Sequence, residues 1–314
     1  MTLRHLVGMI SLVVLTACNP AKADAEATDV LSETLAVDAQ PDDTKPDGAA
    51  AQIEPDQYAA FRDLLLDHQA KAERVARISR QLRVANASLC ERTRLDAGLS
   101  VHRLSDYPEQ VRPLALHFLP LSEEGQSIRS VVPDSPGDLA RLQAGEIILS
   151  GWPLRDGEPL VLSGAQGPES VYLDAEPACI APAYVIATDR LNASTDGRDI
   201  ELSTALVDQV GDDAGLALII AHEMSHIIRG HSSEASRWSL ELQADSDSLI
   251  LMHNAGFDIA ETVAGWEAGV EIHRDSQSFS TTHPPIDIRL KNLQTQLERI
   301  AVAPEAWIAL PDTP

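Results

Sequence analysis

The sequence predicts an α+β fold in which a small β-rich domain precedes a mainly helical C-terminal domain. Apolar side chains recur at spacings of three and four between residues 56 and 90, and residues 212–229 are apolar on nearly all sides; both patterns are typical of helices. Between them, residues 98–173 are rich in Gly, Pro and short apolar runs, as in short strands joined by turns. A chain of 314 residues is long enough for one large domain or two modest ones.

The composition is that of a globular protein and argues against one class of partner. Hydrophobic residues make up 44% and charged residues 23% of the chain, which is ordinary for a soluble domain. Aromatic residues make up only 4%, so the core must consist mainly of Leu, Ile, Val and Ala. The formal net charge is -24, and such a chain repels phosphate backbones. We therefore expect no nucleic-acid partner.

Residues 1–18 have the pattern of an export signal. Arg4 and His5 precede an apolar run of 12 residues, Leu6 to Ala17, which is shorter than the roughly 20 residues of a spanning helix. The run ends in Leu15-Thr16-Ala17-Cys18, which resembles the bacterial lipobox, in which the Cys is lipidated and becomes the mature N-terminus. The alternative is an ordinary signal peptide that contains a Cys. The resemblance implies a lipoprotein that faces the periplasm. Asn19 is not the Asp that usually retains such proteins in the inner membrane, so the outer membrane is favoured.

Residues 19–55 form an acidic segment in which Asp and Glu outnumber Lys, with many Ala and Pro and no aromatic residue. Such a segment cannot bury enough apolar area to offset its chain entropy. We expect a disordered linker that holds the folded part away from the membrane. Residues 56–97 follow as a helical segment that packs on the C-terminal domain, with these apolar residues on one face: Tyr58, Phe61, Leu64, Leu65, Val75, Ile78 and Leu82.

The cysteines indicate an oxidising compartment. Besides Cys18, the chain has Cys90 and Cys179, and two cysteines in an exported protein often pair. We expect a disulfide between them, and the alternative is two buried free thiols. The cysteines lack zinc-ligand spacing, so other residues must hold any metal.

Residues 128–154, IRSVVPDSPGDLARLQAGEIILSGWPL, resemble the second half of a PDZ domain. Ser135-Pro136-Gly137 matches the turn of that pattern, Leu139 to Leu142 the short helix and Ala144 to Ile148 the next strand. Arg141 replaces the usual small residue and Glu146 the usual Asp. The resemblance implies a PDZ-like domain over residues 98–173, whose segment 98–104 receives the end of an extended peptide. The alternative is a small β domain without a ligand.

The stretch LIIAHEMSHIIRGH, residues 218–231, contains the pattern H-E-x-x-H within an apolar helix. Burying two histidines and a glutamate there is costly unless another group satisfies them. His222 and His226 are one turn apart, about 6 Å along the axis, so both imidazoles can bind one zinc ion. Glu223 is rotated by roughly 100° and can reach a water molecule on the metal. We therefore predict a zinc site at this helix.

A third ligand is expected on the following helix. The alternative metzincin pattern would require Gly at position 229 and a ligand at position 232, where the chain has Arg229 and Ser232. The next helix instead contains E-x-x-A-D, with Glu241 as a metal ligand and Asp245 as an acceptor for the distal nitrogen of a zinc-bound histidine. The alternative for both carboxylates is a solvated polar face.

H-E-x-x-H followed by E-x-x-A-D resembles the gluzincin arrangement, and more closely the zinc metallopeptidases that include HtpX, the CAAX prenyl protease, Oma-type proteases and BepA. Two further segments, residues 192–203 and THPPIDIRL at 282–290, match that family in the same order. The resemblance covers roughly residues 176–300. It implies a mainly helical zincin metallopeptidase domain with a small edge sheet over residues 174–302, before a C-terminal tail, 303–314. It also implies one Zn²⁺ per chain.

The same resemblance suggests the remaining roles. Glu223 would act as general base and then acid, and His283 or Arg289 would donate to the oxyanion. His283 could instead lie over the metal and regulate access, or simply begin the last helix. Strand residues near Ile200 and Leu202 are expected to pair with an extended substrate at the sheet edge. The remaining histidines without motif support are read as surface or packing residues: His231, His253 and His273.

Two functions from different classes are consistent with the sequence. The first is a zinc endopeptidase that acts on unfolded or misassembled envelope proteins, with polypeptides and the membrane as its partners. The second is a zinc-containing, chaperone-like lipoprotein that binds peptides with negligible proteolysis. Glu223 favours the first, because a binding protein needs no general base beside its metal. A peptidase of an unrelated zincin fold is a third possibility, against which Glu241 and Asp245 argue.

Overall fold

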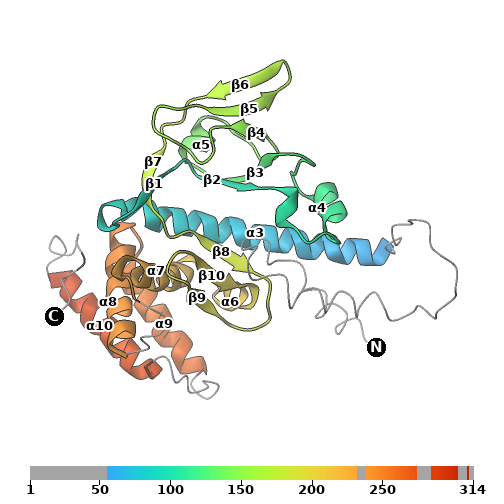
Figure 1. The fold of residues 1–314 in the computed structure, drawn as a ribbon. Helices are drawn as coiled ribbons and strands as arrows, with labels where there is room; N and C mark the ends of the chain where they lie inside the picture. Colours follow the sequence, from blue (N-terminus) through green and yellow to red (C-terminus); the bar gives the residue numbers. More distant parts are fainter. Residues whose placement is uncertain (1–54, 232–237, 274–283, 303–309, 311–314) are drawn as a thin grey trace.

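One long helix, α3 (Pro55–Ala85), lies between a β-rich unit and a helical unit (Figure 1). The computed structural model describes residues 55–231, 238–273, 284–302 and 310. The predictions for Cys18, the signal segment, most of the acidic linker, His283 and the C-terminal tail lie outside the described residues. The architecture is α+β, as the sequence predicts.

The β-rich unit contains an antiparallel five-stranded sheet in the order β2-β3-β4-β5-β6. Its interior is a cluster of apolar side chains that includes Ile128, Ile148 and Leu160. A second cluster, around Leu65 and Ala115, packs α3 against α4. The elements of this unit are β2 (Leu99–His102), η2 (Leu104–Asp106), α4 (Arg112–Phe118), β3 (Gln126–Val131), α5 (Pro136–Leu139), β4 (Ile147–Ser150), β5 (Leu160–Gly164) and β6 (Gly167–Val171).

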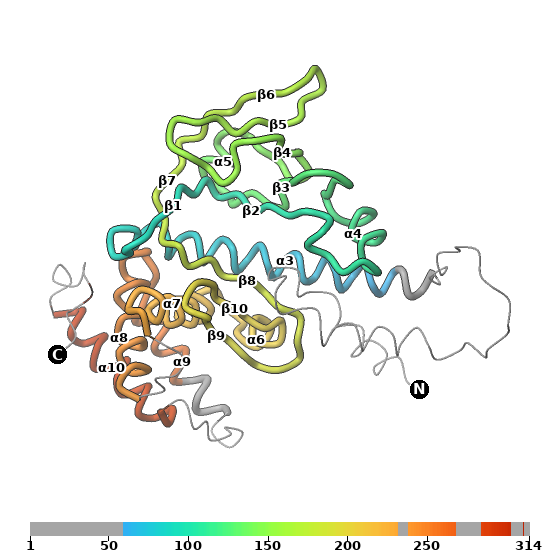
Figure 2. The backbone as a smooth tube through the Cα atoms, in the orientation of Figure 1, coloured from blue at the N-terminus to red at the C-terminus, as the bar shows by residue number. Residues whose placement is uncertain are grey.

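A two-stranded ribbon joins this unit to the rest of the chain. After α3 and the short η1 (Ala87–Leu89), strand β1 (Thr93–Asp96) pairs antiparallel with β7 (Glu176–Cys179). The ribbon passes into the helical unit beside α3 (Figure 2). Cys90 and Cys179 form the predicted disulfide at its base. The end of the segment predicted as helical is therefore a strand.

The helical unit surrounds a three-stranded sheet in the order β8-β10-β9. Its core is the largest apolar cluster of the described residues and includes Leu216, Ile220, Met224, Leu249 and Leu293. In the described chain, no helix is both long and apolar enough to cross a bilayer. The elements of this unit are β8 (Ala183–Ile186), β9 (Ala193–Thr195), β10 (Ile200–Ser203), α6 (Thr204–Gln209), α7 (Asp213–Arg229), α8 (Trp238–Asn254), α9 (Ile259–His273) and α10 (Ile286–Val302).

The position of β10 corrects one prediction. Ile200 and Leu202 were expected at the sheet edge, but β10 is the central strand, parallel to β8 on one side and antiparallel to β9 on the other. Both side chains are completely buried in the core. A substrate strand therefore cannot pair with β10, and the terminal strands of this sheet are β8 and β9.

Two buried histidines, His68 and His102, make hydrogen bonds that suit a neutral imidazole ring. Nε2 of His68 is 3.1 Å from the carbonyl oxygen of Val185. His102 lies between the Tyr107 hydroxyl, 2.8 Å from Nδ1, and the Pro120 carbonyl, 3.0 Å from Nε2. Burial lowers the pKa of each histidine to about 4. Both rings are therefore uncharged near neutral pH.

Because of these two histidines, we expect the free energy of unfolding to fall at acid pH. An unfolded histidine titrates near pH 6.5, so between pH 6.5 and 4 the unfolded chain binds more protons than the folded chain, and stability falls as the pH falls through this window. From pH 7.5 to 5.0 we expect a loss of about 2 kcal/mol per histidine. Urea unfolding of wild type, His68→Gln and His102→Gln at both pH values measures it. Each variant should lose less stability than wild type, and equal losses in all three proteins would rule the explanation out.

Candidate metal centre

Helix α7 is capped at both ends, and the polar residues at its centre are buried. The Asp212 side chain accepts a hydrogen bond from the Gly215 N–H at 2.7 Å and caps the N-terminus. Gly230 ends the helix in the left-handed conformation, with φ of 64°. Midway along this helix, the residues His222 and Glu223 are only 6% and 8% exposed. Their polar groups therefore meet the protein interior and not bulk water.

The structure brings the three predicted metal ligands together. The Nε2 atoms of His222 and His226 are 3.2 Å apart. Glu241, from α8, places Oε2 3.5 Å from Nε2 of His222 and Oε1 3.6 Å from Nε2 of His226. Among the residues that the structure describes, these are the His, Cys, Asp or Glu side chains that gather closely enough to hold a metal ion.

These distances and donor types fit a zinc ion. Tetrahedral zinc with bonds of 2.0 to 2.1 Å places its ligand atoms about 3.3 Å from one another. The two Nε2 atoms are 3.2 Å apart, and each lies at a similar distance, 3.5 or 3.6 Å, from a different oxygen of Glu241. Two imidazoles and one carboxylate are also a donor set typical of catalytic zinc sites, which keep a fourth position open. The residues present therefore fit the predicted zinc.

Glu223 lies beside this group without being part of it. Its carboxylate is buried, and burial raises its pKa above the ordinary value, with a further contribution from the nearby charge of Glu241. A carboxylate with a raised pKa is a stronger proton acceptor than an exposed one. Glu223 is thus suited to take a proton from a water molecule at the open position.

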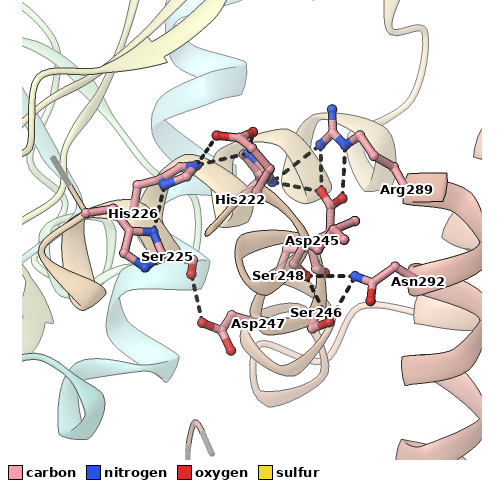
Figure 3. A network of polar contacts seen from close by, with 12 residues as sticks. His222, Ser225, His226, Asp245, Ser246, Asp247, Ser248, Arg289 and Asn292 are labelled. Atoms are coloured by element: carbon pink, nitrogen blue, oxygen red, sulfur yellow. Dashed lines mark hydrogen bonds and ion pairs between the residues drawn. The ribbon is translucent and has the colours of Figure 1, made fainter. Parts of the chain in front are cut away.

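Asp245 and Arg289 orient His222. Nδ1 of His222 is 2.9 Å from Oδ1 of Asp245, and Arg289 donates to both oxygens of Asp245, from Nε at 2.9 Å and from Nη2 at 2.6 Å (Figure 3). Burial opposes ionisation of Asp245, but the hydrogen bonds from Arg289 and His222 lower its pKa. Asp245 therefore has the place that the sequence predicts. Arg289 positions Asp245 through these two hydrogen bonds, and its predicted role as an oxyanion donor stays a prediction.

His231 also lies at the site, although the sequence reading placed it at the surface or in packing. Its Nδ1 is 2.9 Å from Nδ1 of His226. The available sequence signal was Gly230, because a glycine at a helix end reverses the chain and returns the next residue to the last turn. His253, by contrast, is exposed. The His273 side chain lies outside the described part of the structure.

A second polar network lies behind the site and was not predicted. Asp247, which is 1% exposed, accepts hydrogen bonds from Ser225 at 2.9 Å and from Arg229 at 2.8 and 3.1 Å. Asn292 donates to the Leu242 carbonyl at 2.7 Å. These bonds join α7 and α10 to α8. They fix the relative position of α7 and α8, the helices that carry the predicted metal ligands.

Comparison with known proteins agrees with this geometry. Residues 175–240 match the family model described as Peptidase family M48. The matched segment contains His222, Glu223 and His226 and ends just before Glu241. No curated protein and no solved structure matches the chain. The match supports a zinc-dependent metallopeptidase family, and with it metalloprotease activity in general.

Proposed function

We propose that this protein is a zinc-dependent endopeptidase. The observation that carries the proposal is the convergence of His222, His226 and Glu241 beside the buried carboxylate of Glu223. A structural zinc site closes all four positions with protein ligands, whereas this group offers three among the residues that the structure describes. The similarity to peptidase family M48 supports the same reading.

The chain's own residues account for the proton transfers of peptide hydrolysis. Zinc, when bound, would polarise the scissile carbonyl and the attacking water. Glu223 accepts a proton from that water as its oxygen attacks the carbonyl carbon, and then delivers the proton to the leaving nitrogen as the C–N bond breaks. Asp245 keeps the proton of His222 on Nδ1, so that Nε2 faces the metal site.

An extended substrate is expected to pair with strand β9. This strand is terminal in its sheet and packs against α7, which carries His222. An extended polypeptide that pairs with the open edge of β9 would gain main-chain hydrogen bonds without a particular sequence. Such pairing requires an extended backbone, so we expect unfolded chains to be the preferred substrates.

The cellular setting is inferred from the sequence and one covalent feature. Residues 1–18 have the pattern of a lipoprotein signal, and Cys90 and Cys179 form a disulfide. Disulfides persist in oxidising compartments such as the periplasm. We place the protein on the periplasmic side of the envelope, held by a lipid on Cys18 and favouring the outer membrane, where it would remove unfolded or misassembled proteins.

The substrate class can be tested with one protein in two states. Reduced, carboxymethylated α-lactalbumin and native α-lactalbumin share a sequence but differ in fold. We expect the purified protein to cleave the unfolded form, to leave the native form intact and to lose activity with a zinc chelator. Cleavage of neither form, or cleavage that the chelator does not affect, would contradict the proposal.

A second candidate function is peptide capture by the β-rich unit, and a cavity supports it. A cavity of about 240 Å³ lies between the terminal strand β2, the terminal strand β8 and α3. Ala72 and Ala76 of α3 line it with small side chains. Its charged lining consists of Asp96 and four arginines, which are Arg80, Arg83, Arg94 and Arg129. In a chain of net charge -24, this lining favours an extended peptide that carries carboxylates.

Filling the cavity should weaken this binding. In the Glu223→Gln background, Ala76→Leu should lower the affinity for carboxymethylated α-lactalbumin at least tenfold, because the larger side chain occupies the space of the peptide. Ala70→Leu is the matched control, since Ala70 is exposed on the same helix. Fluorescence anisotropy measures both. Equal affinities of the two variants would show that the peptide does not bind in this cavity.

A further inference from the structure

We propose that His231 is a positioning residue that holds the metal ligand His226, as Asp245 holds His222. The inference rests on the proposed zinc site and adds a residue to it. Its basis is the contact between Nδ1 of His231 and Nδ1 of His226 at 2.9 Å. No motif in the sequence assigns a role to His231.

The end of α7 places the His231 ring against the last turn. Gly230, with φ of 64° and ψ of 31°, takes the left-handed conformation that suits glycine. The chain then folds back, and the His231 N–H donates to the His226 carbonyl at 2.9 Å. The two imidazole centroids are 5.1 Å apart, with an angle of 66° between the rings. The contact therefore follows from the helix cap and does not depend on a flexible loop.

The Nδ1 protons of His222 and His226 each require a hydrogen-bond acceptor. If His222 and His226 offer Nε2 to the metal, each ring carries its proton on Nδ1 and must donate it. His222 donates to Asp245 at 2.9 Å. For His226, the group in that place is Nδ1 of His231, which accepts when the His231 proton is on Nε2. The second ligand is thus oriented by a neutral ring.

A contact from α8 supports this assignment. The side chain of Gln243 hydrogen-bonds the His231 ring, and Gln243 lies two residues after the ligand Glu241. An amide oxygen that accepts from Nε2 leaves Nδ1 of His231 without a proton. The same helix therefore supplies the third proposed metal ligand and a hydrogen-bond partner for the residue that orients the second.

The test compares three substitutions in the full-length protein. His231→Gln keeps a side chain that can accept a hydrogen bond, whereas His231→Leu removes the acceptor. His253→Leu is the matched control, because His253 is exposed and lies on α8 away from the ligands. Competition with a chromophoric chelator gives the zinc dissociation constant without reference to turnover, and kcat/KM is measured in parallel.

We expect His231→Leu to weaken zinc binding 10- to 100-fold, as is usual when the partner of a ligating histidine is lost. His231→Gln should restore most of the affinity, and His253→Leu should bind zinc like wild type. Wild-type affinity in His231→Leu, or an equal loss in His231→Gln and His231→Leu, would overturn the positioning role. If wild type itself binds no zinc, the proposed function fails instead, so the two failures are distinguishable.

Discussion

Glu223→Gln should abolish most of the proteolytic activity and leave zinc in place. The amide has nearly the shape of the carboxylate but cannot accept a proton, and loss of a general base typically lowers kcat by 10²- to 10⁴-fold. Because Glu223 is not among the three ligand side chains, we expect zinc content to stay at one per chain. Initial rates on carboxymethylated α-lactalbumin and zinc analysis of the same samples measure both effects.

Glu241→Gln provides the comparison for this result. It is the same chemical change at a residue whose oxygens lie 3.5 and 3.6 Å from the ligand nitrogens. We expect this variant to lose both zinc and activity. A Glu223→Gln protein that cleaves at the wild-type rate would show that Glu223 is not the base, and a zinc-free Glu223→Gln protein would make it a ligand.

Arg289→Met should destabilise the metal-free protein by about 3 to 5 kcal/mol, because the buried charge of Asp245 loses its guanidinium partner and keeps only the contact with His222. Asp245 has a side chain only 3% exposed, and Arg289 donates to both of its oxygens. Arg289→Lys should recover only part of the loss, since an ammonium group cannot reproduce the paired donors of the guanidinium group. Urea unfolding in the presence of a chelator measures these changes without a contribution from zinc.

Lys291→Met is the matched control for this prediction. Lys291 is exposed on the same helix, α10, and its loss should change stability by less than about 0.5 kcal/mol. The double variant Arg289→Met, Asp245→Leu should be more stable than Arg289→Met alone, because the buried carboxylate is removed, but less stable than wild type, because His222 loses its acceptor. If the Arg289→Met variant were as stable as the Lys291→Met variant, the ion pair between Arg289 and Asp245 would contribute nothing to stability.

The clustering of the proposed metal ligands was predictable in part, because helix geometry alone relates two of them. Residues four apart lie on one face of any helix, so His222 and His226 required only that residues 213–229 form a helix, as they do. Glu241 and Asp245 required the packing of a second helix against the first, and their assignment rested on the E-x-x-A-D order of that helix, to which the family resemblance then added support. The resemblance was useful here because its motifs preserve an arrangement that local periodicity does not encode.

The errors and omissions arose where the answer depends on tertiary structure. An apolar strand reads the same whether it is central or terminal, so Ile200 and Leu202 were misplaced at an edge that belongs to β9. The ion pair of Arg289 was not predicted, because its partner Asp245 comes from a helix 44 residues earlier in the chain. His231 depends on the backbone conformation of Gly230, which the sequence suggested without indicating which ring it would meet.

The β-rich unit shows the same limit at a larger scale. Turns and short apolar runs between residues 98 and 173 predict strands, and strands β2 to β6 occur there. The cavity beside β2, however, is completed by α3 and β8, which lie before and after this unit in the sequence. Resemblance to one domain pattern does not describe a cavity whose walls come from three separate segments.

The most direct test of the central claim is a zinc titration of activity. Metal-free protein is mixed with increasing zinc, and the initial rate of cleavage of carboxymethylated α-lactalbumin is followed at each step. We expect activity to rise from zero and to reach a plateau at one zinc per chain, the number that His222, His226 and Glu241 can hold together. Activity that is present without metal, or that zinc never restores, would contradict a zinc-dependent peptidase.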